Sequence, residues 1–357
     1  MGVRIAGTGS YLPGAPIDVE TFKTSLRRYR DGLSEREQDR LVAEVGISTR
    51  HLAIDIADPT RRETNASMAA AAGRRALAAA GWSPADVDLL VVTTIVPDQL
   101  MPPTSTFVQE DLGIARCAEL EISANCTGPY KGLLFATNAL ERGQFKRALL
   151  CSSQYTTFLG RPPWSNPDRM TADQGPLLWI VSDGAGALAL EADARADALQ
   201  VWTESTGCGD RPGMSLMFGA AHPDFLGTYG SGAQHVVQNN RYVLRKALPL
   251  AVAELGRMLD AFRTNGPAID HFIPAVSSMQ VVQRLQPLFE RRLGIRADAW
   301  RMNFTRRGYL GGVTFLSVLD DMVREGSLRP GDLVCSFAEE SSKWMCAGTL
   351  FRWNPER

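Results

Sequence analysis

Cys126 is the residue whose position in the sequence best suits it for chemistry. It lies in a run of small residues over 123–129, between an expected strand over 118–122 and an expected helix over 130–142 that ends at Gly143. A thiol on such a turn faces the positive end of the helix dipole, which favours thiolate over thiol. The backbone N–H groups of the turn can also hold a developing oxyanion. We interpret Cys126 as a nucleophile for acyl transfer; a small buried cysteine that only fills the turn is the alternative.

The other cysteines and the histidines suggest neither a metal site nor a disulfide framework. The cysteines are at 117, 126, 151, 208, 335 and 346, and the histidines at 51, 222, 235 and 271. No CxxC pair and no Cys/His metal spacing occurs among them. We expect reduced thiols, no metal, and no cofactor beyond a thioester substrate. The glycine-rich segments 207–209 and 308–312 lack the strand–turn–helix context of a dinucleotide site.

The composition is that of an ordinary globular chain. Its 357 residues are 45% hydrophobic and 22% charged, with a formal net charge of -1. This balance provides no basic surface for nucleic acid. No run approaches the roughly 18 apolar residues of a membrane helix, and the N-terminus has no apolar segment of signal-peptide length. We therefore expect a soluble, cytoplasmic protein that binds neither nucleic acid nor membranes.

The elements that must position Cys126 alternate between strands and helices. Strand-like apolar runs occur at 87–94, 148–153 and 186–191, and helical patterns at 64–80 and 104–112. This alternation predicts a layered α/β fold.

The second half of the chain repeats the pattern of the first. An apolar run at 269–276 corresponds to 87–94, and a helical pattern at 313–325 corresponds to the helix after Cys126. In both halves a helix ends in glycine and the next strand ends in Cys-Ser, at 151–152 and at 335–336. The repeat is far too long for a solenoid. It predicts two similar α/β halves packed together, with a site at their junction.

Two long stretches, 158–175 and 208–234, break the alternation. Segments of this length in a compact domain are commonly lids or binding loops. We interpret them as walls of an acyl pocket, with plain surface excursions as the alternative.

Several short motifs are spread along the chain. They are Gly46-Ile47-Ser48-Thr49-Arg50, Thr93-Thr94 with Pro97-Asp98 and Pro102 or Pro103, Asn125-Cys126-Thr127-Gly128, Ser182-Asp183-Gly184-Ala185-Gly186-Ala187 and Arg352-Trp353. Their order and spacing resemble those of the thiolase superfamily, and within it the β-ketoacyl-acyl-carrier-protein synthase III group. The resemblance implies a thiolase-like fold, with two duplicated halves packed as a layered α-β-α-β-α sandwich. Residues 1–191 would form the half that carries the nucleophile, and 192–357 the half that carries the base and oxyanion loops. It also implies a homodimer, with the loop 97–103 near the interface and the partner's pocket.

The chain departs from the family pattern at the site itself. Ala275 stands where the resemblance implies the catalytic His, and Tyr309 where it implies the catalytic Asn. The segment 339–343 replaces a glycine-rich loop that helps to form the oxyanion hole. These variants resemble a subgroup found in specialised metabolism. Two explanations of Ala275 stay open, natural loss of the His and a deliberate His→Ala substitution.

The resemblance also implies roles for the neighbouring polar residues. The backbone N–H of Cys126, with one from Ser341 or Ser342, would form the oxyanion hole. Ser278 and Tyr309 would line the empty base site, and Glu339 or Glu340 would give polar support. His271 lies four residues before Ala275 on the same strand, about 13 Å away at ~3.3 Å per residue. We expect it to be structural rather than a substitute base.

These departures favour acyl transfer over condensation. In the family, the His and Asn stabilise the enolate that forms when a malonyl thioester loses CO₂. Without them, Cys126 can still accept an acyl group and deliver it to an oxygen or nitrogen nucleophile. We therefore predict an acyltransferase of the ketosynthase III type in natural-product biosynthesis, including polyketides and antibiotics. The rivals are a condensing enzyme mutated at Ala275 and a non-catalytic partner subunit, against which the retained Cys126 argues.

The donor is predicted to be an acyl carrier protein or acyl-CoA, and the acceptor a small molecule. Arg40 and Glu44 stand where CoA-using members carry a Trp and an Arg that sandwich the adenine, which favours a carrier protein. Arg284, Arg291 and Arg292 could dock an acidic carrier protein; a solvated helix face is the alternative.

Overall fold

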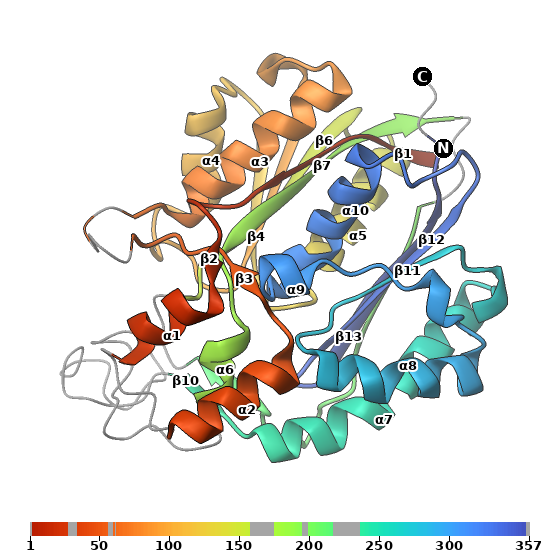
Figure 1. Ribbon diagram of the computed structural model, residues 1–357. Coiled ribbons are helices and arrows are strands. Elements are labelled where there is room, and N and C mark those ends of the chain that lie inside the picture. Colours follow the sequence, from red (N-terminus) through yellow and green to blue (C-terminus); the bar gives the residue numbers. More distant parts are fainter. Residues whose placement is uncertain are drawn as a thin grey trace.

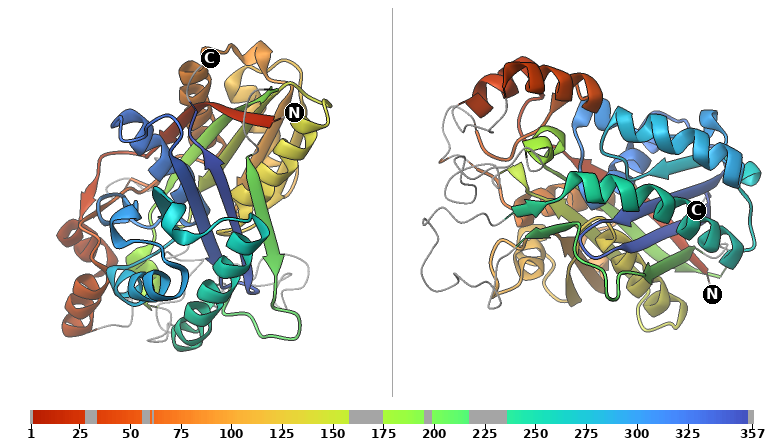
Figure 2. Two further views of the ribbon diagram at one scale, coloured as in Figure 1. Left: turned by 90° about the vertical axis from the view of Figure 1, so that its right-hand side faces the viewer. Right: turned by 90° about the horizontal axis from the view of Figure 1, so that it is seen from below.

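Two large β-sheets lie between layers of helices in the described part of the protein, and two short strand pairs lie beside them (Figures 1 and 2). The computed structural model describes residues 2–27, 34–55, 60, 62–157, 175–194, 199–216 and 236–354. The helices of the layers are α3 (Asn65–Ala80), α4 (Thr104–Leu112), α5 (Gly128–Glu141), α7 (Asn240–Ala261), α8 (Met279–Leu293) and α10 (Thr314–Arg324). α3 and α4 cover the outer face of the first sheet, α5 and α10 lie between the sheets, and α7 and α8 cover the outer face of the second.

The first sheet has the strand order β1-β7-β6-β4-β5. Its strands are β1 (Gly2–Tyr11), β4 (Leu89–Thr94), β5 (Ala118–Ser123), β6 (Arg147–Gln154) and β7 (Gly184–Asp193). β4 runs parallel to β5 and β6, whereas β7 is antiparallel to β6 and β1. Helices cover both faces of this sheet, which is why β4 is buried along its whole length and begins with four apolar residues in a row.

The second sheet repeats this order as β8-β13-β12-β11. Its strands are β8 (Gln200–Ser205), β11 (His271–Pro274), β12 (Leu333–Glu340) and β13 (Met345–Arg352). β11 and β12 are parallel, as β4 and β6 are, and β12 and β13 are antiparallel, as β6 and β7 are. The predicted α/β sandwich with a duplicated strand order is therefore confirmed. The division between residues 191 and 192 stays a prediction.

Apolar clusters fill the spaces between the layers. In the central layer, the Tyr130 ring of α5 stacks on the Phe315 ring of α10 with centroids 5.5 Å apart. On the outer side of the first sheet, the alanines of α3 pack directly on β1. A Cβ on Gly7 would lie 2.4 Å from the backbone oxygen of Ala76, so this close approach requires glycine.

The remaining elements flank one side of the two sheets. They are α1 (Val19–Arg27), α2 (Glu35–Val45), α6 (Gly175–Ile180), α9 (Phe304–Arg307), the strand pair β2 (Ile17–Asp18) with β3 (Thr49–Arg50), and the pair β9 (Met214–Leu216) with β10 (Val236–Gln238). Short 3₁₀ turns occupy Pro84–Asp86, Gly266–Ala268, Ala297–Ala299 and Gly311–Val313. No helix in the described ranges is long and apolar enough to cross a membrane.

The stretch 208–234 and the helix α7 differ from the sequence expectation. The stretch 208–234 is not structureless throughout, because Met214–Leu216 forms the strand that pairs with β10. The rest of it from 217, and the residues 158–174, lie outside the described residues. The 22-residue helix α7 was not predicted; it contains Pro249, which lacks an N–H and normally argues against a helix interior.

Candidate active site

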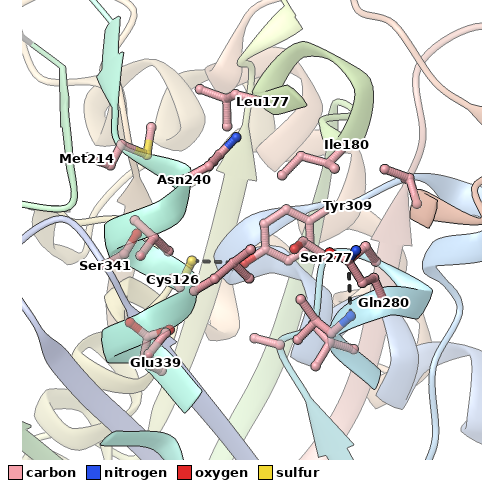
Figure 3. A pocket seen from close by; sticks show the side chains of 18 of the residues that line it. Cys126, Leu177, Ile180, Met214, Asn240, Ser277, Gln280, Tyr309, Glu339 and Ser341 are labelled. Atoms are coloured by element: carbon pink, nitrogen blue, oxygen red, sulfur yellow. Dashed lines mark hydrogen bonds between the residues drawn. The ribbon is translucent and has the colours of Figure 1, made fainter. Parts of the chain in front are cut away.

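Cys126 lies at the turn between β5 and α5, and only 6% of it is exposed. Its thiol contacts a cavity between the two halves, where its Sγ lies 3.1 Å from the Tyr309 hydroxyl oxygen (Figure 3). α5 begins at Gly128, two residues earlier than expected, with Pro129 in its first turn. Proline is favourable there because the first turn has no use for its missing N–H. The predicted placement of Cys126 on a strand-to-helix turn is thus what the structure has.

The loop that carries Tyr309 is held against the nucleophile turn. The Tyr309 N–H donates to the Ile180 carbonyl at 2.9 Å, and its own carbonyl accepts from the Ser182 N–H at 3.0 Å. A Cβ on Gly312 would lie 2.9 Å from the Asn125 carbonyl oxygen, so only glycine permits this approach. Tyr309 does more than line the site, since its hydroxyl contacts Cys126 directly.

Tyr309 can act as a hydrogen-bond donor to the Cys126 sulfur. Burial is the largest cause that raises the pKa of Tyr309 well above its usual value, and the nearby Cys126 is the second, so the phenol keeps its proton. The hydrogen bond between them lowers the pKa of Cys126. A hydrogen bond to the charged form of a group favours that form, which is why the phenol supports the thiolate.

Glu340 occupies the N-terminal end of α5. One of its carboxylate oxygens accepts from the Thr127 N–H at 3.0 Å and from the Thr127 hydroxyl at 2.6 Å. The Ser342 hydroxyl donates to the other oxygen. Glu340 is therefore a buried cap on the helix that follows the nucleophile, brought there from β12.

The expectation that the helix end favours thiolate is wrong for this site. Burial, followed by the charge of Glu340, raises the pKa of Cys126 to about 12, against the lowering effect of Tyr309. The negative carboxylate sits at the same helix end whose positive dipole was expected to stabilise the thiolate. Cys126 is therefore a thiol at rest, and it needs another group to accept its proton before it can act as the predicted nucleophile.

Glu339, unlike Glu340, has one carboxylate oxygen that accepts no hydrogen bond in the described part of the chain. Successive side chains of a strand point to opposite faces, so Glu340 faces α5 while Glu339 lines the cavity (Figure 3). Its Oε1 is buried without a hydrogen-bond partner in the described part of the chain. Burial, followed by the charge of Glu340, raises the pKa of Glu339 to about 8.

The structure brings most of the other predicted site residues together. Ala275, Ser278 and Ser341 line the same cavity as Cys126 and Tyr309. The Ala275 N–H donates to the Phe337 carbonyl at 3.0 Å, and the Ser278 side chain caps α8 by accepting from the Val281 N–H at 3.3 Å. Ser342 is not among the residues that line the cavity; it bonds Glu340 instead. The oxyanion role of the N–H groups stays a prediction.

His271 belongs to a separate, structural network. Its Nε2 is 2.9 Å from an Asp332 carboxylate oxygen, and the Arg301 guanidinium donates to its Nδ1 at 3.0 Å. Because Arg301 has only donors to offer, the imidazole proton is on Nε2 and points at Asp332. His271 does not line the cavity, in agreement with its predicted structural role.

The cavity has a volume of about 410 Å³ and mainly apolar walls. These walls come from peripheral helices: Leu41 and Val45 of α2, Leu178 of α6, Leu244 and Ala247 of α7, and Leu285 of α8. Met214 also lines it, which places one described residue of 208–234 where an acyl pocket wall was expected. Arg40 and Glu44 line it too, and they form an ion pair in which Arg40 Nε lies 3.8 Å from Glu44 Oε1. In the described part of the chain, no group of three or more His, Cys, Asp or Glu could hold a metal ion.

The motif residues that carried the resemblance mostly hold the site's scaffold. The buried Arg50 guanidinium donates to the Trp179 carbonyl at 2.9 Å and lies 3.8 Å from the centre of the Phe22 ring. Asp183 accepts from the Ala53 N–H at 2.9 Å. The sequence analysis named Glu339 and Glu340 only as polar support for the site and did not predict that Glu340 caps α5. The two glutamates are adjacent near the end of a strand, which puts their side chains on opposite faces and could have indicated that their roles differ.

Comparison of the sequence with known proteins identifies the family to which the chain belongs. No family model matches the chain. It is 30% identical over 335 residues to the β-ketoacyl-[acyl-carrier-protein] synthase III of Sphingopyxis alaskensis, covering 92% of both chains. It is also 30% identical over 339 residues to the same enzyme of Rhodospirillum centenum, covering 92% of this chain and 93% of that one.

Solved structures of similar fold agree. AbyA1, described as a tetronic acid condensing enzyme, matches with a TM-score of 0.80 at 24% identity, over 98% of this chain and all 100% of its own. The 3-oxoacyl-[acyl-carrier-protein] synthase III of Aquifex aeolicus matches with a TM-score of 0.76 at 21% identity, over 99% and 100%. These likenesses confirm the thiolase-like fold. Identity of 30% sustained over nearly the full length of both chains shows that this protein belongs to the β-ketoacyl-[acyl-carrier-protein] synthase III family of the thiolase superfamily.

Proposed function

We propose that the protein is an acyltransferase of specialised metabolism. Cys126 takes an acyl group from a carrier-protein or CoA thioester and passes it to the hydroxyl or amine of a small acceptor. The observation that carries this proposal is the pair of groups beside the thiol. Where the resemblance implies an imidazole and an amide to hold an enolate, the cavity has the methyl group of Ala275 and the phenol of Tyr309. Neither replaces an imidazole as a base, because one has no titratable atom and the other stays protonated.

The cavity supports an apolar acyl group larger than acetyl. Its volume of about 410 Å³ lies in the range of ligand pockets, and aliphatic side chains from four helices line it. A carrier protein is the favoured donor. Arg40 and Glu44 pair with each other at the positions where an adenine clamp would stand, and the family relatives are named for an acyl carrier protein.

We also propose a two-fold homodimer. β5 is the edge strand of the first sheet, and an unpaired edge is a template for strand pairing with a second chain. In the loop 97–103, Leu100 is 80% and Met101 is 84% exposed, an apolar patch that a partner could cover.

A condensing enzyme is the second candidate, and one observation favours it. The relatives of this chain are named as β-ketoacyl synthases, and the similar structure AbyA1 is described as a condensing enzyme. A His at position 275 would then be the missing group. A non-catalytic subunit is less well supported, since Cys126 retains its hydrogen bond to Tyr309 inside a cavity.

Incubation with carboxyl-labelled malonyl-carrier protein and with a panel of acyl-carrier proteins tests the proposal. We expect an adduct on Cys126, detected by intact mass and peptide mapping, and no labelled CO₂. The Cys126→Ala variant should give no adduct, which controls for the other cysteines. Labelled CO₂ coupled to a β-ketoacyl product would establish condensation instead. Because the origin of Ala275 is open, the test is run on this chain and on its Ala275→His variant.

A further inference from the structure

We propose that Glu339 is the proton-transfer residue of this site and performs the task for which the family resemblance implies an imidazole at position 275. The inference rests on the proposed acyl transfer, because both half-reactions of that chemistry must move a proton. It starts from one observation: Glu339 places a carboxylate in the cavity with a buried oxygen that accepts no hydrogen bond in the described part of the chain.

The other titratable side chains that line the cavity are already engaged. Among described residues they are Arg40, Glu44, Cys126 and Tyr309. Arg40 and Glu44 form an ion pair, and Cys126 is the nucleophile, bonded to the Tyr309 hydroxyl. Tyr309 keeps its proton, so its phenol does not act as a base. Because the Arg40–Glu44 pair is exposed to solvent, Glu339 is the carboxylate among the described lining residues that has a buried oxygen without a hydrogen bond.

The neighbouring acid Glu340 cannot take this role. Both of its carboxylate oxygens accept hydrogen bonds, one from Thr127 and the other from Ser342. It also faces α5 rather than the cavity, as the alternation along β12 requires. Only one of these two adjacent glutamates is therefore free to exchange protons with a substrate.

Glu339 is electrostatically close to the reacting groups. Burial and the charge of Glu340 are the two largest causes that raise the pKa of Cys126, and the charge of Glu339 adds to them. The charge of Glu339 also raises the pKa of Tyr309. The titratable groups around it are these two across the cavity, Glu340 on its own strand, and Cys346, its partner on β13. Its own pKa of about 8 suits a group that accepts and returns a proton near neutral pH.

The proton movements balance over two half-reactions. In the first, Glu339 takes the thiol proton of Cys126 as Sγ attacks the donor carbonyl carbon. The bond between that carbon and the donor sulfur breaks, and the leaving thiolate takes the proton from Glu339.

In the second half-reaction, Glu339 takes the proton of the acceptor O–H or N–H as that atom attacks the acyl carbon. The bond from the acyl carbon to Sγ breaks, and Cys126 leaves as a thiolate beside the Tyr309 hydroxyl. Glu339 then returns the proton to the sulfur. It ends each half-reaction ionised, so no further reagent is consumed.

The Glu339→Gln variant tests this role, because glutamine keeps the shape and cannot accept a proton. The probes are the N-acetylcysteamine thioester of octanoic acid as donor and ethanolamine as acceptor. Acylation of Cys126 and transfer to ethanolamine, followed by intact mass, should each slow by about 10²–10⁴-fold. The rate of the unaltered protein should rise with pH through an apparent pKa near 8, and this rise should be absent from the variant.

Glu254→Gln is the matched control. Glu254 is a buried glutamate of α7 that pairs with Arg257 at 3.2 Å and does not line the cavity. This variant should keep the rates and the pH profile. If Glu339→Gln does not fold, two other measurements take its place. One is the pH profile of the unaltered protein. The other is the variant Glu339→Asp, whose shorter carboxylate should slow transfer without abolishing the rise of the rate with pH.

Alkylation of Cys126 by iodoacetamide separates this inference from the proposed function, since it needs the thiol proton removed but no acyl donor. If Glu339 is the base, Glu339→Gln slows alkylation. If Glu339 acts only as a charge that opposes the thiolate, the same variant lowers the pKa of Cys126 and speeds alkylation. Equal or faster alkylation overturns the role of Glu339, whatever the thioester assays give. Slower alkylation with no acylation by any thioester would instead count against the proposed function.

Discussion

Replacing Tyr309 with Phe removes the hydroxyl that supports the Cys126 thiolate and leaves the ring in place. That hydroxyl lies 3.1 Å from Sγ, and a hydrogen bond to a charged group contributes about 1.5–3 kcal/mol. The bond lowers the pKa of Cys126, so its loss should raise that pKa further and reduce the thiolate present at any fixed pH. At tenfold per 1.4 kcal/mol, thiolate reactions should slow by about 12- to 140-fold.

The assay is the rate of Cys126 alkylation by iodoacetamide, followed by peptide mass at several pH values. Tyr11→Phe is the control, because it removes a hydroxyl that donates to Glu63 at 3.0 Å and does not line the cavity. It should not change alkylation. The stability loss from either variant should stay near 0.5–1.5 kcal/mol, so both should fold. A Tyr309→Phe rate equal to or above that of the unaltered protein would refute the reasoning.

Three further outcomes are expected. Glu340→Gln removes a charge that raises the pKa of Cys126, so alkylation should become faster at fixed pH; a slower rate would mean that the cap, not the charge, matters more. Ala275→His should raise transfer by about 10²–10⁴-fold if a His was replaced there, and should leave it unchanged or lower if Ala275 is natural. Light scattering at micromolar concentration should give a dimer mass, and Leu100→Glu with Met101→Glu should shift it toward the monomer; a monomer without these changes would contradict the proposed interface.

Local signals in the sequence were enough to place the nucleophile. A strand, a run of small residues and a proline-started helix fall within a few residues of Cys126, and propensity and capping act over that range. The duplicated strand order also followed from repeated local patterns. α7 was missed because Pro249 argues locally against a helix, although the helix packs on the second sheet along its apolar face.

The electrostatics of the site could not be predicted in the same way. Tyr309 lies 183 positions from Cys126, and Glu340 lies 213 positions from the Thr127 that it caps. Only the packing of one half against the other brings these groups to the start of α5. A helix dipole can be inferred from a local pattern, but a charge delivered to the helix end by a distant strand cannot.

The layered construction separates the reaction from the choice of substrate. Cys126 lies on the β5–α5 turn, Tyr309 on the loop after α9 and Glu339 on β12. Most of the cavity's apolar walls instead come from the outer helices α2, α6, α7 and α8. Ala247 and Ala251 on α7 line the cavity with small side chains. Larger residues there would shorten the space for the proposed acyl chain without replacing Cys126, Tyr309 or Glu339. Such a protein can diversify its substrates through mutations in its outer layer that leave the groups around Cys126 in place.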